Sequence, residues 1–177
     1  KMVRYADDFV LMGSSIPQQA VDRLGNILER MGLKLNESKT RLVKAVETPF
    51  KFLGFTVRYD KDIKGRDKSY WNIIPSDKSE KKIREKISTF LHESGHFAPP
   101  RVSEGLNTMI RGWLNYYDVP AVSYPAMSKR KLRYYLIEKL NRYYNRKSQR
   151  RSRLYGQQAF ERLVHKYGLI DPTKYSV

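Results

Sequence analysis

The sequence predicts an α+β chain, in which a small antiparallel sheet with one helix is followed by a three-helix bundle. Apolar runs on either side of residues 5–8 indicate a first β-hairpin, and residues 50–59 and 69–74 indicate a second. After Pro75, apolar residues recur at helical spacing in three successive segments with short connections. These observations place the strands in the first half of the chain and the helices in the second.

The first half contains one predicted helix, which follows the first hairpin. Ser14 and Ser15 offer hydroxyl groups that cap a helix, and Pro17 suits its first turn. Gly32 is a good residue to end it. One face of the predicted helix carries Val21, Leu24, Ile27, Leu28 and Met31.

Short strands are expected to complete the sheet after this helix. The candidates are Leu33–Leu35 and Thr40–Val43. The polar residues 60–67 are expected to connect the two strands of the second hairpin. Residues 1–74 are therefore treated as one domain.

Three serines mark the predicted helix starts in the second half. Ser76, Ser103 and Ser128 each precede an apolar stripe, and residues 95–100 and 119–125 break the helices. The stripes contain Ile83, Ile87, Phe90 and Leu91, then Leu106, Ile110, Trp113, Leu114 and Tyr117, then Leu132, Leu136, Leu140, Tyr143 and Tyr144.

The bundle is assigned to residues 75–150, and residues 151–177 are expected to form a basic tail. This tail has one short helical stripe and then Gly168 and Pro172. Segments near a chain end pack weakly unless other contacts hold them. We therefore expect the tail to pack loosely or to fray.

The composition favours a polyanionic partner. Lys and Arg total 35 against 18 Asp and Glu, which gives a formal net charge of +17. Residues 1–75 carry 14 basic and 9 acidic side chains, and residues 76–177 carry 21 and 9, so most of the excess lies in the second half. Nucleic acid is the first candidate, and an anionic membrane surface is a more distant one because the predicted helices lack a wide apolar face.

Other functional classes receive no support from the composition. There is no cysteine, which excludes disulfides and thiolate metal sites. The three histidines lack metal-ligand spacing. No apolar run approaches the length that spans a bilayer, and the first residues have no signal-peptide pattern. We expect a cytoplasmic protein, of bacterial type, and no oligomeric state follows from the sequence.

The most informative motif is the acidic turn of the first hairpin, which reads Tyr5-Ala6-Asp7-Asp8. A tight turn brings two neighbouring carboxylates to one end of a hairpin, where they are able to present oxygen ligands to a cation. Asp is also a favoured turn residue without any function. These four residues alone leave both readings open.

Four motifs in order resemble those of group II intron reverse transcriptases and maturases. They are Tyr5-Ala6-Asp7-Asp8, residues 32–40, Phe52-Leu53-Gly54-Phe55 and residues 110–117, and the resemblance extends to about residue 145. It implies that residues 1–74 are part of a polymerase palm and residues 75–150 a thumb. Family members carry fingers and most of the palm before this hairpin, so we expect the chain to be the carboxyl-terminal part of a larger enzyme.

The resemblance implies a catalytic role for the first hairpin. Asp7 corresponds to a direct magnesium ligand, Asp8 to the residue that tunes the site, and Tyr5 to a residue beside the primer terminus. Two magnesium ions held by carboxylates catalyse nucleotide addition in such enzymes. Two carboxylates on one turn are too few for that site, so residues outside this chain are expected to complete it and the chain alone is expected to be inactive.

The resemblance assigns two more sites in the first half. Lys39 lies where related polymerases have a basic residue facing the nucleotide triphosphate, and the alternative is a solvated lysine beside a turn. Phe52, Leu53 and Gly54 resemble the primer grip, where the glycine lets the backbone approach the primer. The alternative for Gly54 is an ordinary β-bulge.

Residues 110–117 are predicted to contact nucleic acid from the second helix of the bundle. Arg111 and Asn115 lie four residues apart and so share one side, which is expected to face a duplex minor groove. A glycine inside a helix lowers its stability by about 1 kcal/mol relative to alanine. The presence of Gly112 therefore suggests that another group approaches the helix closely at this position. Trp113 is expected to be a core residue.

The third helix of the bundle carries the strongest charge bias. Between Lys129 and Arg153 there are 11 basic residues and one acidic residue, Glu138. The tyrosines interleaved with them are expected to pack in the bundle rather than to stack on bases. The predicted phosphate contacts are Lys129, Arg130, Lys131, Arg133, Arg142, Arg146, Lys147, Arg150 and Arg151.

Two functions follow, from different classes. The first is part of an RNA-directed DNA polymerase that binds template and primer RNA and an RNA/DNA duplex, with deoxynucleotides and magnesium used by the intact enzyme. The second is a non-catalytic RNA-binding splicing cofactor of maturase type. The intact Asp7 and Asp8 favour the first.

Overall fold

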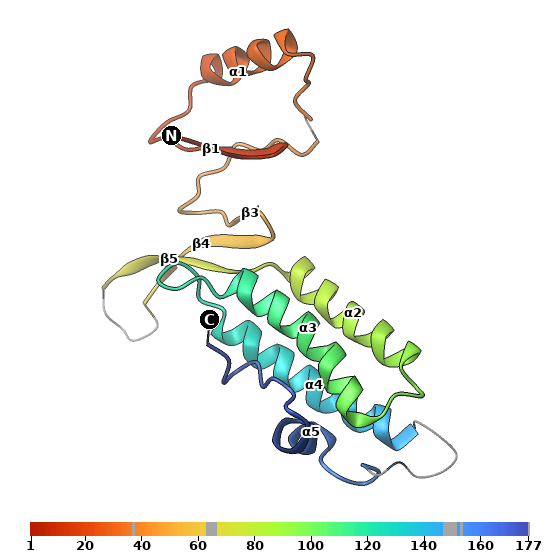
Figure 1. The fold of residues 1–177 in the computed structure, drawn as a ribbon. Coiled ribbons are helices and arrows are strands. Elements are labelled where there is room, and N and C mark those ends of the chain that lie inside the picture. The colour runs from red at the N-terminus through yellow and green to blue at the C-terminus, as the bar shows by residue number, and fades with distance from the viewer. Residues whose placement is uncertain (37, 63–66, 147–151, 153, 177) are drawn as a thin grey trace.

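The structure is a computed structural model that describes residues 1–36, 38–62, 67–146, 152 and 154–176. The predicted contacts Lys147, Arg150 and Arg151 lie outside the described residues. Two antiparallel sheets and five helices confirm the α+β class. The elements form three levels in Figure 1: a hairpin with one helix, a three-stranded sheet, and a helical unit.

The first hairpin forms as predicted. Strands β1 (Met2–Tyr5) and β2 (Asp8–Leu11) are antiparallel, with Tyr5 opposite Asp8, so the connection is the two-residue loop Ala6-Asp7. Figure 1 shows helix α1 lying beside this hairpin, on the side away from the second sheet. The hairpin and α1 therefore form the outermost level of the molecule.

Helix α1 (Gln18–Arg30) ends as predicted and begins differently. Pro17 itself is the N-cap residue and no side chain caps the helix, so the predicted serine caps are wrong. At the other end, the backbone N–H groups of Gly32 and Leu33 donate to Glu29 and Leu28, and Gly32 has φ +73°. This is a Schellman motif, which needs a residue with positive φ at the glycine position.

The short strands predicted at Leu33–Leu35 and Thr40–Val43 are wrong. Among the described residues of these segments there is no strand. The Asn36 carbonyl accepts from the backbone N–H groups of both Lys39 and Thr40, so the chain turns here. An isolated strand leaves its backbone groups without partners, and a local turn satisfies some of them.

The predicted pairing of the second hairpin is confirmed, but its first arm, residues 50–59, is two strands rather than one because the chain turns back at Leu53 and Gly54. Strands β3 (Phe50–Phe52), β4 (Phe55–Lys61) and β5 (Ser69–Pro75) are antiparallel, in the order β3-β4-β5. Phe55 pairs with both Phe52 and Pro75. The end of β5 leads directly into the first helix of the helical unit, which fixes the sheet against it.

The helical unit contains α2 (Asp77–Glu93), α3 (Pro99–Tyr117), α4 (Ala126–Arg146) and α5 (Ala159–Tyr167). Ser76 caps α2 as predicted, because its side chain accepts from the backbone N–H of Ser79 at 3.3 Å. Ser103 and Ser128 are buried inside α3 and α4, so their predicted capping roles are wrong. Pro99 and Pro100 start α3 instead, where a missing N–H costs nothing.

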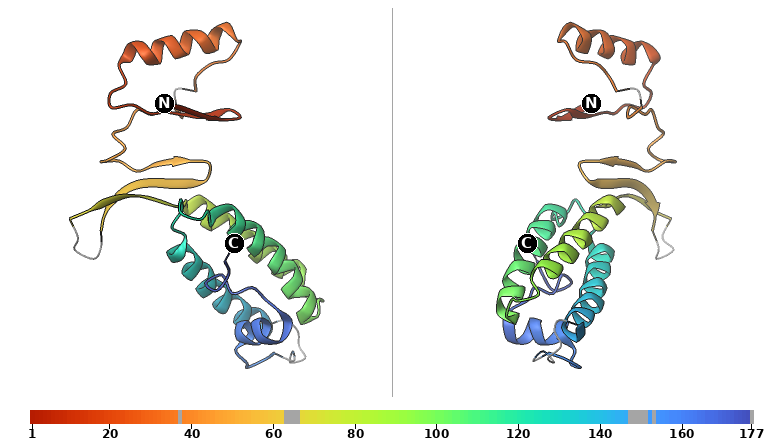
Figure 2. Two further views of the ribbon diagram at one scale, coloured as in Figure 1. Left: turned by 60° about the vertical axis from the view of Figure 1, so that its left-hand side comes forward. Right: turned by 90° about the vertical axis from the view of Figure 1, so that its right-hand side faces the viewer.

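The carboxyl-terminal segment does not fray. Helices α2 and α5 each pack against both α3 and α4, so α5 completes the bundle at its open side (Figure 2). Phe160, Leu163 and Leu169 are at most 2% exposed. The prediction of a loose tail is therefore wrong. The apolar stripe of residues 160–169 is long enough to pack against the bundle, although it lies near the end of the chain.

A close helix contact is found at Gly105 and not at Gly112. A side chain added at Gly105 would lie 2.2 Å from the Phe90 ring, so α2 and α3 approach closely there. No atom lies within 4 Å of the corresponding position at Gly112, which contradicts the expected close approach. Trp113 is 8% exposed and belongs to the core, as predicted. Within the described residues, no helix is both long and apolar enough to cross a membrane.

Candidate nucleic-acid interface

The acidic turn is open to solvent. Asp7 and Asp8 are both exposed at the end of the first hairpin. Ala6 has φ +50°, a left-handed conformation that costs a non-glycine residue about 1 kcal/mol, and its carbonyl accepts from Arg4 Nε at 3.0 Å. The turn therefore presents both carboxylates without burying either of them.

Asp7 and Asp8 offer hard oxygen ligands of the kind that magnesium prefers. In the described part of the chain, no three or more His, Cys, Asp or Glu residues are grouped so as to hold a metal ion. The two carboxylates thus fit one part of a magnesium site, and a complete set of ligands is not assembled by the described residues.

The turn between β3 and β4 has a constrained backbone. Its two loop residues, Leu53 and Gly54, have φ +48° and +79°, which is the pattern of a type I′ turn. A bulky residue such as leucine avoids this region unless its surroundings hold it there. The Tyr116 hydroxyl provides such a contact, because it donates to the Leu53 carbonyl at 3.0 Å.

The Gly54 carbonyl is held by two hydrogen-bond donors. It accepts from the backbone N–H of Ser76 at 2.9 Å and from the Ser79 hydroxyl at 3.0 Å. The Ser79 oxygen also lies 2.5 Å from the Tyr117 hydroxyl. Because Ser79 has a single hydroxyl hydrogen and donates it to Gly54, the Tyr117 hydroxyl is the donor in that pair. The turn is thereby tied to the start of α2 and the end of α3.

Three aromatic rings pack against one another next to this turn. The Phe55 ring stacks on Tyr116 with centroids 5.7 Å apart and meets the edge of Tyr117 at 4.9 Å. We call Leu53, Gly54, Phe55, Tyr116 and Tyr117 the tyrosine junction. It joins the predicted primer grip to the end of α3, two motifs about 60 residues apart in the sequence.

The first hairpin also lies near the tyrosine junction. Burial raises the pKa of Tyr116, and the neighbouring phenols of Tyr117 and Tyr5 raise it further. Tyr5 of the acidic turn motif is therefore close enough to act on Tyr116 electrostatically. Both views of Figure 2 show the β1–β2 turn and the β3–β4 turn on the same side of the molecule. Three of the four motifs found in the sequence thus converge in space.

The remaining predicted contacts of the first half and of α3 lie at the surface. Lys39 is exposed in the turn after Asn36. Arg111 and Asn115 are both exposed on α3, on one side of it as predicted. The Asn115 side chain accepts from the Tyr175 hydroxyl at 2.8 Å, so it also anchors the carboxyl-terminal segment.

Three of the predicted phosphate contacts on α4 have partners inside the protein, namely Lys129, Lys131 and, through Asp171, Arg133. The Lys129 ammonium lies 2.5 Å from Asp118 and donates to the Tyr175 carbonyl at 2.9 Å. Lys131 pairs with the buried Glu80, which also accepts from Ser128 at 2.6 Å. These contacts join α4 to α2, to the loop after α3 and to the carboxyl-terminal segment, which is a structural use of positive charge.

The other basic residues of α4 face outward. Arg130, Arg142 and Arg146 are exposed, and Arg142 pairs with Glu138 one turn away on the same helix. An exposed pair of this kind is weak and leaves the guanidinium available to a phosphate. Tyr134 is 69% exposed, so the expectation that the tyrosines of α4 pack in the bundle is wrong at this position.

Most of the helical unit matches a known family. Residues 80–159 match the family described as "Group II intron, maturase-specific domain". The chain is related to the group II intron maturases. It is also similar to the COX1/OXI3 intron 1 protein of Saccharomyces cerevisiae, with 43% identity over 60 residues. These residues are 32% of this chain and 7% of that protein, so the chain spans a small part of its relative.

The maturase-specific domain runs from Glu80 in α2 to the first residue of α5. The tyrosine junction lies at its edge, where Tyr116 and Tyr117 belong to the domain and Leu53 and Gly54 do not. The rest of α5, which the match does not include, still packs on α3 and α4. The matched residues therefore contact the segments that precede and follow them in the chain.

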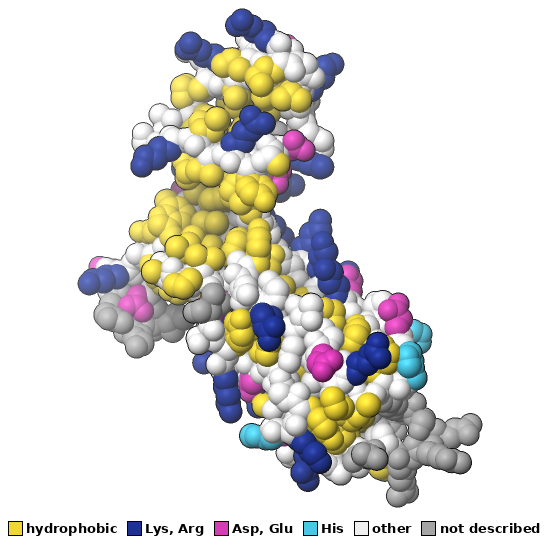
Figure 3. All heavy atoms as spheres, viewed as in Figure 1, with side chains coloured by type: hydrophobic (Ala, Val, Ile, Leu, Met, Phe, Trp, Pro, Cys, Tyr) yellow, Lys and Arg dark blue, Asp and Glu magenta, His cyan; other side chains and the backbone are white. Residues whose placement is uncertain are grey.

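A row of basic residues on α2 was missed in the sequence. Lys78, Lys82 and Lys86 are all exposed and recur every four residues, so they form one row on the helix surface. The row could have been found, because the apolar stripe of α2 defines its opposite face. In Figure 3, Lys and Arg side chains lie on every level in view, and hydrophobic side chains gather over the three-stranded sheet.

Proposed function

We propose that this chain binds intron RNA through its helical unit and assists splicing as part of a maturase. The observation that carries the proposal is the match of residues 80–159 to the maturase-specific domain. The charge supports it, since residues 76–177 hold 21 basic and 9 acidic side chains. Exposed cations on α2 and α4 are suited to the phosphates of a folded RNA.

A binding competition tests this proposal. The purified chain is mixed with a labelled, folded group II intron RNA, and unlabelled competitors are added: the same RNA, a transfer RNA, and a DNA duplex of equal length. We expect the intron RNA to compete best, because a maturase reads the shape of its RNA as well as its charge. Equal competition by all three polyanions, or no binding, would contradict the proposal.

We further propose that the complete protein is an RNA-directed DNA polymerase. Asp7 and Asp8 would hold magnesium together with ligands from the rest of that protein, and bound magnesium would activate the primer hydroxyl and stabilise the charge on the phosphate. Tyr5 would lie beside the primer terminus, the Leu53-Gly54 turn would grip the primer, and Lys39 would face the incoming deoxynucleotide. The proximity of Tyr5 to the tyrosine junction supports this arrangement.

Substitution of Asp7 by alanine in the complete protein separates the two proposals. We expect DNA synthesis on a primed RNA template to be lost and intron splicing to be retained, because Asp7 is an exposed acidic residue and not one of the basic side chains proposed to bind the intron RNA. Retained DNA synthesis would remove the polymerase proposal and leave the splicing proposal intact. Loss of splicing alone would overturn the assignment of the two roles to different parts of the chain.

A further inference from the structure

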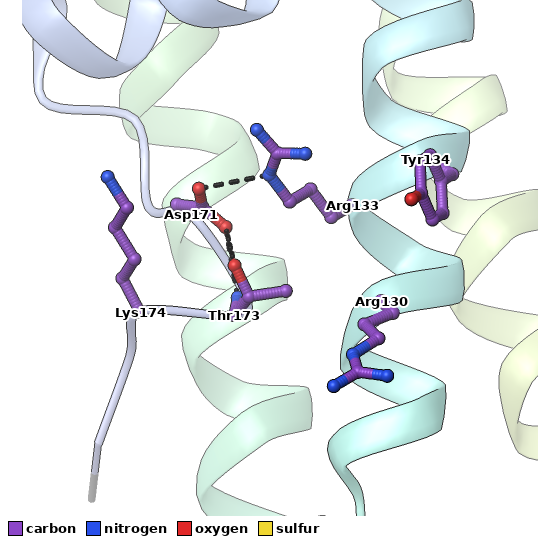
Figure 4. A pocket seen from close by; sticks show the side chains of 6 residues that line it. All are labelled: Arg130, Arg133, Tyr134, Asp171, Thr173 and Lys174. Atoms are coloured by element: carbon purple, nitrogen blue, oxygen red, sulfur yellow. Dashed lines mark hydrogen bonds and ion pairs between the residues drawn. The ribbon is translucent and has the colours of Figure 1, made fainter.

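A hollow of about 330 Å³ lies between α4 and the carboxyl-terminal segment. This size falls in the range of small-ligand pockets. Figure 4 shows side chains from two walls, α4 on one side and residues 171–174 on the other. The residues that line it are Arg130, Arg133, Tyr134, Asp171, Thr173 and Lys174.

One wall of the hollow is fixed by an internal ion pair. Arg133 Nε donates to Asp171 at 3.1 Å, and the other Asp171 oxygen accepts from the Thr173 hydroxyl at 2.7 Å and its backbone N–H at 3.0 Å. The Arg133 guanidinium also lies 5.3 Å from the centre of the Phe160 ring. These contacts neutralise Arg133 and hold the carboxyl-terminal segment in place, so they shape the site rather than bind a ligand.

Two cations of the hollow have no such partner. Arg130 on α4 and Lys174 on the opposite wall are both exposed, and no ion pair is formed by either within the described residues. The only carboxylate lining the hollow is Asp171, which Arg133 already neutralises. Two uncompensated positive charges lining one hollow attract anions to it.

Tyr134 adds an aromatic surface next to these charges. It lies one helical turn beyond Arg130, so the two side chains share a side of α4. Its side chain is 69% exposed, which leaves a ring face available to another planar group. An anion site beside an uncovered aromatic ring is the combination that proteins use for single-stranded nucleic acid.

We propose that this hollow binds one unpaired nucleotide of the RNA, with its phosphate at Arg130, attracted also by the charge of Lys174, and its base stacked on Tyr134. The proposal rests on the proposed function, because it names how the same helical unit recognises RNA. A base inside a duplex is already stacked on its neighbours and cannot reach the Tyr134 ring. The hollow therefore selects single strands, loops or bulges over continuous helices.

Crosslinking and affinity test the site in the full chain. The probes are a ten-residue oligouridine containing one 5-iodouridine and the same strand paired with its complement. We expect ultraviolet light to crosslink the single strand to Tyr134, as located by mass spectrometry of the digested chain, and the duplex to give no crosslink there. Crosslinking of the single strand elsewhere only, or of the duplex equally well at Tyr134, would overturn the proposal.

Substitutions give a second readout. Tyr134→Ala should weaken binding of the single strand about tenfold, the effect of losing one stacked base. Lys174→Gln should weaken it and lower the salt slope by roughly one phosphate contact. The matched controls Tyr59→Ala and Lys68→Gln change exposed residues of the sheet region and should leave affinity unchanged.

The outcomes separate this inference from the proposed function. If the chain binds folded intron RNA while Tyr134→Ala and Lys174→Gln behave like their controls, the hollow is not a nucleotide site and the proposed function stands. If the unsubstituted chain binds neither intron RNA nor the oligouridine, both fail. Thermal unfolding of each variant checks that the exposed substitutions leave the fold intact.

Discussion

The Tyr117 hydroxyl lies 2.5 Å from the Ser79 hydroxyl, which in turn donates to the Gly54 carbonyl. This chain of two hydrogen bonds links the end of α3, the first turn of α2 and the turn between β3 and β4. Since the Tyr116 hydroxyl binds the neighbouring Leu53 carbonyl, two consecutive residues of α3 fix two consecutive residues of the turn. The orientation of the sheet against the helical unit depends on these contacts.

Gly54→Ala should destabilise the chain through this junction. An added Cβ would lie 2.5 Å from the Tyr117 hydroxyl and 3.2 Å from Ser79, and alanine is also strained at φ +79°. We expect a loss of about 2–4 kcal/mol in the free energy of unfolding, the sum of about 1 kcal/mol for the backbone and the cost of overpacking.

Gly156→Ala is the matched control for that substitution. Gly156 has a similar φ of +68°, and no atom lies within 4 Å of its Cβ position. The control should therefore lose only the backbone part, about 1 kcal/mol. Urea unfolding measures the loss in free energy of unfolding for both variants. Equal losses would show that the contacts at Tyr117 and Ser79 do not constrain the turn.

Leu163→Ala should destabilise the helical unit as strongly as a central core substitution. Leu163 is fully buried in α5, and removal of a buried leucine side chain costs about 2–5 kcal/mol. The exposed neighbour Arg162 serves as the control, and its change to alanine should cost at most about 0.5 kcal/mol. Thermal unfolding that is unchanged in Leu163→Ala would mean that α5 is detached from the bundle.

Acid should weaken the docking of the carboxyl-terminal segment through Asp171. Burial alone would raise the pKa of this carboxyl group, but hydrogen bonds from Thr173 and Arg133 and the charge of Arg133 bring it below its ordinary value of 3.8. The unfolded chain then binds more protons than the folded chain, so this contribution is complete above about pH 4 and is lost as the pH falls further.

Asp171→Asn tests this assignment. At pH 7 the variant should be about 1–2 kcal/mol less stable, because it loses charged hydrogen bonds at a partly exposed guanidinium. The difference from the unsubstituted chain should shrink when unfolding is measured at pH 3 instead of pH 7. A difference that stays constant between these two values would show that the ionised carboxylate contributes nothing.

The lysine row of α2 should contribute to RNA binding. Changing Lys78, Lys82 and Lys86 together to glutamine removes three exposed charges from one helix face, and affinity for folded intron RNA should fall about 10- to 100-fold at low salt. The control removes the same total charge from the sheet region through Lys44, Lys61 and Lys68. Filter binding that shows equal losses in both triple variants would point to net charge rather than to the row.

The sequence predicted those elements whose signal is local. The first hairpin turn, the cap at Ser76 and the apolar stripes of α2, α3 and α4 each depend on residues close together in the chain. The helix starts at α3 and α4 were misplaced because serine also occurs buried inside a helix. Ser128 is buried there with Glu80 as its partner, and the Ser103 hydroxyl is buried without a partner among the described residues. Nothing in the local pattern distinguishes these two uses.

The candidate site was predicted only in its parts. The motifs at Tyr5, Leu53 and Tyr116 were recognised singly, but their convergence depends on tertiary contacts that no spacing encodes. The positive charge that α4 offers to RNA was overestimated for the same reason. The acidic residues that pair with Lys129, Lys131 and Arg133 come from α2, from the loop after α3 and from the carboxyl-terminal segment. The hollow beside Tyr134 was missed because its second wall was expected to be a loose tail.

The salt dependence of RNA binding tests the central claim most directly. The affinity of the chain for folded group II intron RNA is measured from 50 to 300 mM potassium chloride at constant magnesium. The account predicts a straight decline of log affinity with log salt, at a slope of about 0.7–0.9 per phosphate contact and therefore of several units in total. A flat line, or no binding at the lowest salt, would contradict it.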